Sequence, residues 1–165
     1  MGKQKETSLG VQKITTDFKT FTPELQAALR VYQGNLLCSG AYIGSDMRCK
    51  ADTAFTRQVL HYEYRTHHAT RNGKVRVAHP GQQISGKEFS LVMEQNPTIL
   101  PTENPDAIRP AGKNAKTCVR YDDSGLGAGV QYEENGHKQL IYSFPLESLE
   151  QFEPFYENAI MWLTK

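Results

Sequence analysis

The sequence lacks a large excess of either charge. Its 165 residues include 19 Lys or Arg and 18 Asp or Glu, so the formal net charge is +1. A net charge this small creates no overall attraction toward polyanions. Because no cluster of Lys and Arg stands out either, we do not expect the protein to bind nucleic acid or an anionic membrane surface.

Long apolar runs are also missing. No stretch reaches the roughly 18 consecutive apolar residues that a membrane-spanning helix needs. Residues 1–12 are polar and lack the apolar segment of a signal peptide. We therefore expect residues 1–19 to be a polar lead, either disordered or vector-derived, and residues 20–165 to form one α/β domain. A chain of this length can bury about two-thirds of its unfolded surface around a single core.

Cysteine is scarce and its spacing is uninformative. The chain has three cysteines, Cys38, Cys49 and Cys118, and no two of them form a C-x-x-C motif. An odd number at such spacings argues against a disulfide framework and against a structural zinc site. We expect free thiols, with one bridge at most.

The first half of the domain carries helix and strand signals. Thr22-Pro23-Glu24 predicts a helix start, with a hydroxyl cap, a proline at the first helical position and an early acid. Gly34 fits a left-handed position after the helix. Leu36-Leu37-Cys38 predicts a short buried strand that runs into the small-residue loop Ser39 to Asp46.

The rest of the domain predicts a mixture of strands and helices. A second helix is predicted over residues 52–66, because no Gly or Pro interrupts it. Asn135-Gly136 predicts a tight hairpin turn, since both positions of such a turn need a positive φ. Ser148 and Gln151 have the spacing of a capping box, which predicts a short turn at 148–152 and a final helix from 154. Strands are predicted at 74–78, 88–93, 117–121, 129–133 and 138–143.

This order of elements predicts a three-layer α/β domain with a mixed sheet. Helices alternate with strands early in the chain, whereas the late strands pair through a hairpin. In such sheets a ligand site lies outside the carboxyl ends of the strands. The loops Ser39 to Asp46 and Phe144 to Glu147 are both expected at that edge.

Two segments resemble a known family. Leu36 to Asp46 (LLCSGAYIGSD), the late hairpin and Ser143 to Ser148 (SFPLES) are similar to the C-terminal part of a class I glutamine-amidotransferase-like domain. More narrowly, they resemble domains of large bacterial secreted or envelope proteins named xanthan lyase or N-acetylmuramoyl-L-alanine amidase. The resemblance covers residues 20–165. It implies a flavodoxin-like mixed sheet, a longer parent protein of which this is the C-terminal part, and a periplasmic or extracellular location.

The resemblance also implies a catalytic site that is degenerate here. In working members, a Cys on the elbow after a central strand is activated by the His of a His-Pro-Glu motif after the hairpin. Phe144 stands where that histidine would be, and Leu146 separates Pro145 from Glu147. Cys38 also lacks the Gly-x-Cys-x-Gly frame of the family nucleophile.

Candidate site residues follow from these two loops. If the chain is a hydrolase, Ser39 or Cys38 is the nucleophile, His79 at a strand end is the base and Glu147 orients it. The alternative is that Ser39 is a turn or capping hydroxyl and that Asp46 caps a helix. The candidates for lining a ligand pocket at this edge are Gly40, Tyr42, Asp46 and Phe144.

The other histidines do not predict a metal site or a cofactor. His61 and Glu63 are two positions apart and would not share a helix face. His67 and His68 are adjacent and do not converge on one ion in regular backbone. His137 falls in the hairpin.

Three functions remain open from the sequence. The first is a non-catalytic scaffold or binding module that packs against other domains of a parent protein or against glycan or peptidoglycan. The second is an amidase or related hydrolase, and any polysaccharide lyase activity would reside elsewhere in the parent protein. The third is a stand-alone interaction protein with a ligand at the strand ends.

Overall fold

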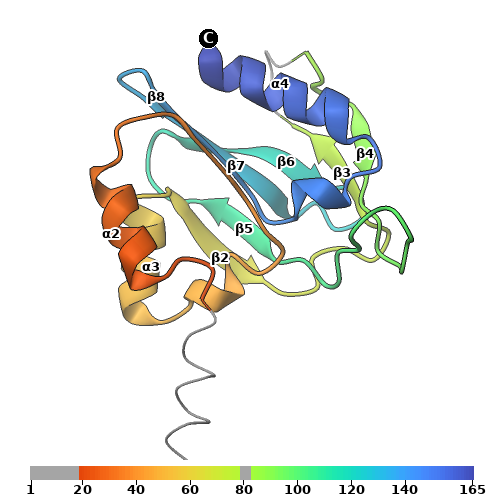
Figure 1. The fold of residues 1–165 in the computed structure, drawn as a ribbon, viewed down its shortest axis with the longest axis horizontal. Helices are drawn as coiled ribbons and strands as arrows, with labels where there is room; N and C mark the ends of the chain where they lie inside the picture. Colours follow the sequence, from red (N-terminus) through yellow and green to blue (C-terminus); the bar gives the residue numbers. More distant parts are fainter. Residues whose placement is uncertain (1–18, 79–82) are drawn as a thin grey trace, which may run out of the picture.

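The computed structural model describes residues 19–78 and 83–165 (Figure 1). Residues 1–18 of the expected polar lead and the candidate base His79 lie outside the described residues. The helices and strands, in chain order, are α2 (Pro23–Val31), β1 (Leu36–Ser39), η1 (Ser45–Met47), α3 (Lys50–Gln58), β2 (Tyr62–Thr66), β3 (Lys74–Val77), β4 (Glu88–Ser90), β5 (Ala107–Pro110), β6 (Ala115–Tyr121), β7 (Gly127–Glu134), β8 (His137–Tyr142), η2 (Leu146–Ser148) and α4 (Phe152–Thr164).

The main sheet has six strands in the order β1-β8-β7-β6-β3-β4. β1 and β8 are parallel, whereas the other neighbours in this sheet are antiparallel. A second sheet contains β2 and β5, which are antiparallel. The expectation of a mixed α/β domain with a late hairpin and a C-terminal helix is therefore confirmed.

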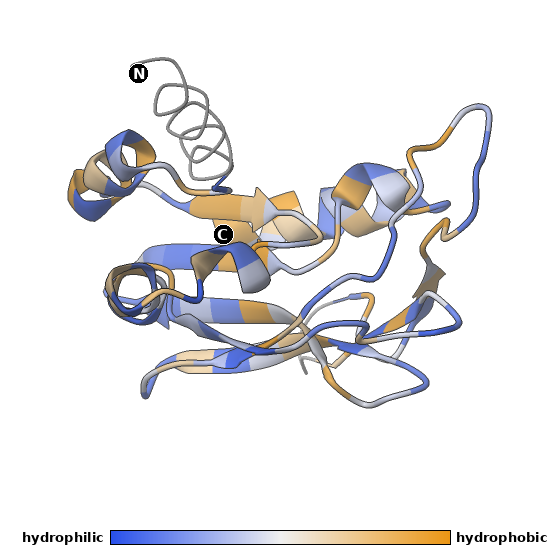
Figure 2. Ribbon diagram, turned by 90° about the horizontal axis from the view of Figure 1, so that it is seen from below, coloured by the Kyte–Doolittle hydropathy of each residue, from blue (hydrophilic) through white to orange (hydrophobic). Residues whose placement is uncertain are grey.

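The strands of the main sheet separate two hydrophobic clusters. Along β8, Leu140 and Tyr142 belong to the cluster that also contains Phe155 of α4, whereas Ile141 belongs to the cluster that contains Phe55 of α3. This alternation is what a strand buried on both faces requires. α4 lies over one face, and α3 with the β2–β5 sheet lies over the other (Figure 1). Figure 2 shows hydrophobic and hydrophilic residues alternating around the helices, as expected for helices that bury one side.

Two local predictions are confirmed in detail. Thr22 caps α2, because its side-chain hydroxyl accepts a hydrogen bond from the Leu25 N–H at 3.3 Å. In the β7–β8 hairpin, Asn135 and Gly136 have φ values of 52° and 80°. The Asn-Gly pair therefore forms the tight turn that its sequence predicts.

The predicted helix 52–66 is wrong in its second half. α3 ends at Gln58, and His61 then takes a φ of 56°, after which the chain forms β2. β2 pairs with β5, where the side chain of Arg109 donates to Glu63 at 2.6 Å. Pairing with a strand that is distant in sequence overrides the helical pattern.

Two predicted helix signals do not act as expected. Gly34 does not have a positive φ, and α2 instead ends at an extended Tyr32. Glycine is needed at position 34 for space, because a Cβ there would clash with the Tyr32 ring. Ser148 and Gln151 form no capping box. Ser148 lies in η2 with its hydroxyl unpaired among the described residues, and the Gln151 side chain accepts from the Ser90 N–H at 3.1 Å. The Glu150 N–H donates to the Ser90 carbonyl of β4 at 3.0 Å, and α4 begins at Phe152, two residues before the predicted start.

Candidate functional site

The two loops of interest lie at one edge of the main sheet. β1 and β8 are parallel, with Ser39 opposite Tyr142, so both strands end at the same edge. The Gly40 N–H donates to the Tyr142 carbonyl at 3.1 Å, which ties the elbow to the end of β8. The prediction that the segments 39–46 and 144–147 both begin at one edge of the sheet is therefore confirmed.

The two candidate nucleophiles are poorly activated. Ser39 is the last residue of β1, so the strand extends one residue beyond Cys38. Cys38 packs against the cluster that contains Phe55, and burial raises the pKa of its thiol to about 11. At neutral pH the thiol is protonated and is a weak nucleophile. The Ser39 hydroxyl makes no hydrogen bond with any other described residue.

The end of β8 presents an aromatic core residue instead of a base. Phe144 is fully buried, and its ring centroid lies 5.5 Å from that of Tyr142 and 5.9 Å from that of Phe155. Glu147 lies in η2 and is exposed. Neither residue brings an imidazole or an orienting carboxylate to Cys38.

The remaining elbow candidates make structural contacts. A Cβ at Gly40 would come within 2.9 Å of the Ile43 side chain. Tyr42 is half exposed, and its hydroxyl donates to the Glu103 carbonyl at 2.8 Å. Asp46 lies inside η1, which has Gly44 as its N-cap, and accepts from the Thr20 hydroxyl at 2.9 Å. The expectation that Asp46 caps a helix is therefore wrong, because the N-cap lies two residues earlier, at Gly44.

A carboxylate–imidazole pair beside the elbow was not found from the sequence. Asp106 is fully buried and lies 3.0 Å from His67 Nδ1. The same carboxylate accepts from the Ser45 N–H at 2.6 Å, and the Asp106 N–H donates to the Ala41 carbonyl at 2.9 Å. A buried carboxylate that orients an imidazole is the arrangement of a general base. No local sequence signal links these residues, because His67 and Asp106 are 39 positions apart.

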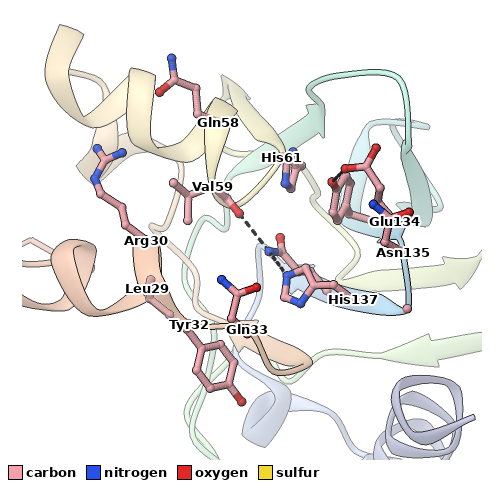
Figure 3. Close-up of a pocket in the computed structure, with 13 residues that line it drawn as sticks. Leu29, Arg30, Tyr32, Gln33, Gln58, Val59, His61, Glu134, Asn135 and His137 are labelled. Atoms are coloured by element: carbon pink, nitrogen blue, oxygen red, sulfur yellow. Dashed lines mark hydrogen bonds between the residues drawn. The ribbon is translucent and has the colours of Figure 1, made fainter.

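The opposite end of the β1–β8 pair contains a pocket of about 490 Å³ (Figure 3). It lies between the end of α2, the segment after α3 and the β7–β8 hairpin. Polar and aromatic side chains dominate its lining, which consists of Leu29, Arg30, Tyr32, Gln33, Gln58, Val59, His61, Tyr132, Glu134, Asn135, Gly136, His137 and Gln139. Pockets of this size commonly hold small molecules.

The floor of this pocket contains an incompletely bonded pair. The Gln139 side-chain amide donates to the Val59 carbonyl at 2.9 Å and lies 2.9 Å from His137 Nε2 (Figure 3). Gln139 Oε1 and His137 Nδ1 are both buried and have no hydrogen-bond partner among the described residues. Each such atom costs about 1–3 kcal/mol.

A stacked ring pair forms one side of the pocket. The rings of His61 and Tyr132 are 3.5 Å apart and nearly parallel. Burial lowers the pKa of His61, so the imidazole is neutral at neutral pH. The Tyr132 hydroxyl donates to Glu134 at 2.7 Å, and burial together with this bond raises the pKa of Tyr132 to about 12. The other Glu134 oxygen accepts from Asn114 at 2.7 Å.

Within residues 19–78 and 83–165, no three His, Cys, Asp or Glu side chains gather closely enough to hold a metal ion. None of the helices in those ranges has the length and apolar character needed to cross a membrane. The described cysteines are all free thiols. Comparison with protein-family models, with curated proteins and with solved structures found no match to this chain.

Proposed function

We propose that this chain is a non-catalytic α/β module, a degenerate amidotransferase-like domain with a flavodoxin-like ancestry. It serves as a scaffold or binding unit of a larger bacterial periplasmic or extracellular protein linked to glycan or cell-wall processing. The observation that carries the proposal is Phe144, which is fully buried among aromatic rings at the position where a catalytic histidine would follow the hairpin. The parallel β1–β8 pair and the elbow after β1 support the amidotransferase-like assignment.

The chemistry of the elbow supports the same conclusion. Acyl transfer to a thiol needs a thiolate, a base within hydrogen-bond reach and an oriented carboxylate. Cys38 is held protonated by burial, and Glu147 is exposed to solvent. Neither group is poised to form or break an amide bond.

Covalent labelling tests this proposal directly. We expect a fluorophosphonate to leave Ser39 unmodified and iodoacetamide to leave Cys38 unmodified in the folded protein. Cys49 is exposed and serves as the positive control for thiol reactivity, which Cys49→Ser removes. Modification of Ser39 or Cys38 that disappears in Ser39→Ala or Cys38→Ala would overturn the proposal.

A hydrolase remains the second candidate because of one observation. His67 lies 3.0 Å from the fully buried Asp106 carboxylate, next to the elbow loop. An imidazole held in this way can accept a proton from a nearby hydroxyl. If this pair is catalytic, turnover of an amide substrate falls in both Ser39→Ala and His67→Gln, whereas His68→Gln, a change at the adjacent exposed histidine, leaves turnover unchanged. Absence of any turnover in wild-type protein favours the non-catalytic module.

A further inference from the structure

The pocket between α2 and the β7–β8 hairpin contains two unsatisfied polar atoms on its floor. Gln139 is 4% exposed, and its Oε1 has no partner among the described residues. His137 Nδ1 is also buried and has no hydrogen-bond partner among the described residues. Buried polar atoms are nearly always hydrogen-bonded in folded proteins, so a pair of orphans in one pocket indicates a missing partner.

The existing hydrogen bonds fix what each orphan atom offers. The Gln139 NH₂ group has two hydrogens, and one of them is donated to the Val59 carbonyl. The second hydrogen points to His137 Nε2 at 2.9 Å, so Nε2 acts as an acceptor. In a neutral imidazole the proton is then on Nδ1, which becomes a donor. The pocket floor therefore offers one N–H donor and one carbonyl acceptor.

We propose that this pocket binds a small neutral ligand through a carboxamide group. The carbonyl oxygen of a carboxamide accepts from His137 Nδ1, and its N–H donates to Gln139 Oε1. A carboxamide carries both groups in one planar unit. One functional group thus matches the donor and the acceptor that the pocket lining offers, without a charge on either partner.

The surrounding charges favour a neutral ligand over an ion. The Glu134 carboxylate is already bonded to Tyr132 and Asn114, so neither of its oxygens is left without a donor. His61 is neutral, because burial lowers its pKa. The guanidinium of Arg30 lies over the Phe55 ring, 5.4 Å from its centroid. The pocket has no excess charge of either sign to select an anion or a cation.

The ligand reaches the two orphan atoms only when lining side chains move, because both atoms are covered from solvent. Gln33 and Gln58 line the pocket and are exposed, so their rotamers can change. The pocket lies at the other end of β1 from the elbow, so ligand binding there does not require a catalytic elbow.

Titration of ¹⁵N-labelled protein followed by NMR tests the proposal. The probes are N-acetylglucosamine and N-acetylalaninamide, which present the amide on a sugar and on a peptide, and the controls are glucose and acetate. We expect at least one amide probe to shift the Gln139 side-chain NH₂ signals and the backbone signals of residues 58–61 and 134–139, while the controls do not. The probe that binds identifies the source of the amide. No shift at these positions with either probe, or equal shifts with glucose or acetate, would overturn the proposal.

A matched pair of variants tests the donor. His137→Gln keeps an acceptor for the Gln139 NH₂ group but removes the Nδ1 donor, and we expect it to weaken binding about tenfold, the factor for one hydrogen bond. His68→Gln, an equivalent change at an exposed histidine distant from the pocket in the fold, leaves the affinity unchanged. The dispersion of the NMR spectrum reports whether each variant is folded. Unchanged affinity in folded His137→Gln would contradict the proposed contact, and an unfolded variant leaves the wild-type shift map as the deciding result.

Discussion

Replacing Phe144 by histidine introduces the residue type that the proposed amidotransferase-like origin implies at the end of the hairpin. The structure predicts that this change destabilises the fold and creates no activity. Phe144 is fully buried, and burial of a phenylalanine side chain contributes about 1.5–3 kcal/mol. Its ring pairs with those of Tyr142 and Phe155 add about 0.5–1.5 kcal/mol each.

An imidazole at position 144 loses part of this stabilisation and adds a cost. It retains some of the buried area, but its two nitrogens meet aromatic rings, and a buried polar atom without a partner costs about 1–3 kcal/mol. We expect Phe144→His to lower the free energy of unfolding by about 3–5 kcal/mol. Phe144→Leu, which keeps the site apolar, is the matched control, and we expect a loss of about 1 kcal/mol.

Urea denaturation at neutral pH measures both losses, and an amide-hydrolysis assay on the same samples measures activity. The reasoning is refuted if Phe144→His is less than about 1 kcal/mol below wild type, since a polar ring would then fit the site. It is also refuted if the variant gains turnover that a second change, Cys38→Ala or Ser39→Ala, abolishes. The first result would show that the site accommodates a polar ring, and the second would show that a histidine at position 144 can act on the elbow.

Three further changes test other parts of the structure. Burial lowers the pKa of His61 below its ordinary 6.5, so the unfolded state binds more protons below that pH. The free energy of unfolding therefore falls as pH drops through 6.5. His61→Asn, which tolerates the φ of 56°, should reduce this pH dependence in denaturation curves taken across that range. Thr22→Ala removes the cap of α2 and should cost about 1 kcal/mol in the same assay, with no loss expected if the cap bond is absent in solution. A Cβ at Gly127 would overlap the Ile108 carbonyl, so Gly127→Ala should cost about 1–3 kcal/mol, and a stability equal to wild type would contradict the close approach of β7 and β5.

Local sequence signals predicted the elements that depend on neighbouring residues. Thr22-Pro23 starts α2 and Asn135-Gly136 turns the hairpin, because a cap and a positive-φ turn each need only a few consecutive residues. The alternation of element types predicted a mixed sheet with the elbow and Phe144 at one edge, whereas the parallel pairing of β1 with β8 is seen only in the structure.

Features that depend on distant partners were not predictable in the same way. β2 was taken for helix because nothing in residues 59–66 marks a break, and a left-handed backbone such as that of His61 is uncommon for any residue other than glycine. β5 was missed among prolines, although a strand that ends at Pro110 is compatible with a two-stranded sheet. The pocket floor joins Val59 to Gln139, which are 80 positions apart, so no spacing rule could have found it.

The pairing of β1 with β8 has a consequence for how the protein is made. The Lys138 N–H donates to the Asn35 side chain across 103 positions of sequence, and the strands beyond these residues pair directly. During synthesis, Leu36 to Ser39 therefore leave the ribosome long before their partner strand β8 has been made. Until β8 arrives, β1 is apolar on both faces and its backbone edge is unpaired. We expect the chain to depend most on chaperones at this stage of synthesis.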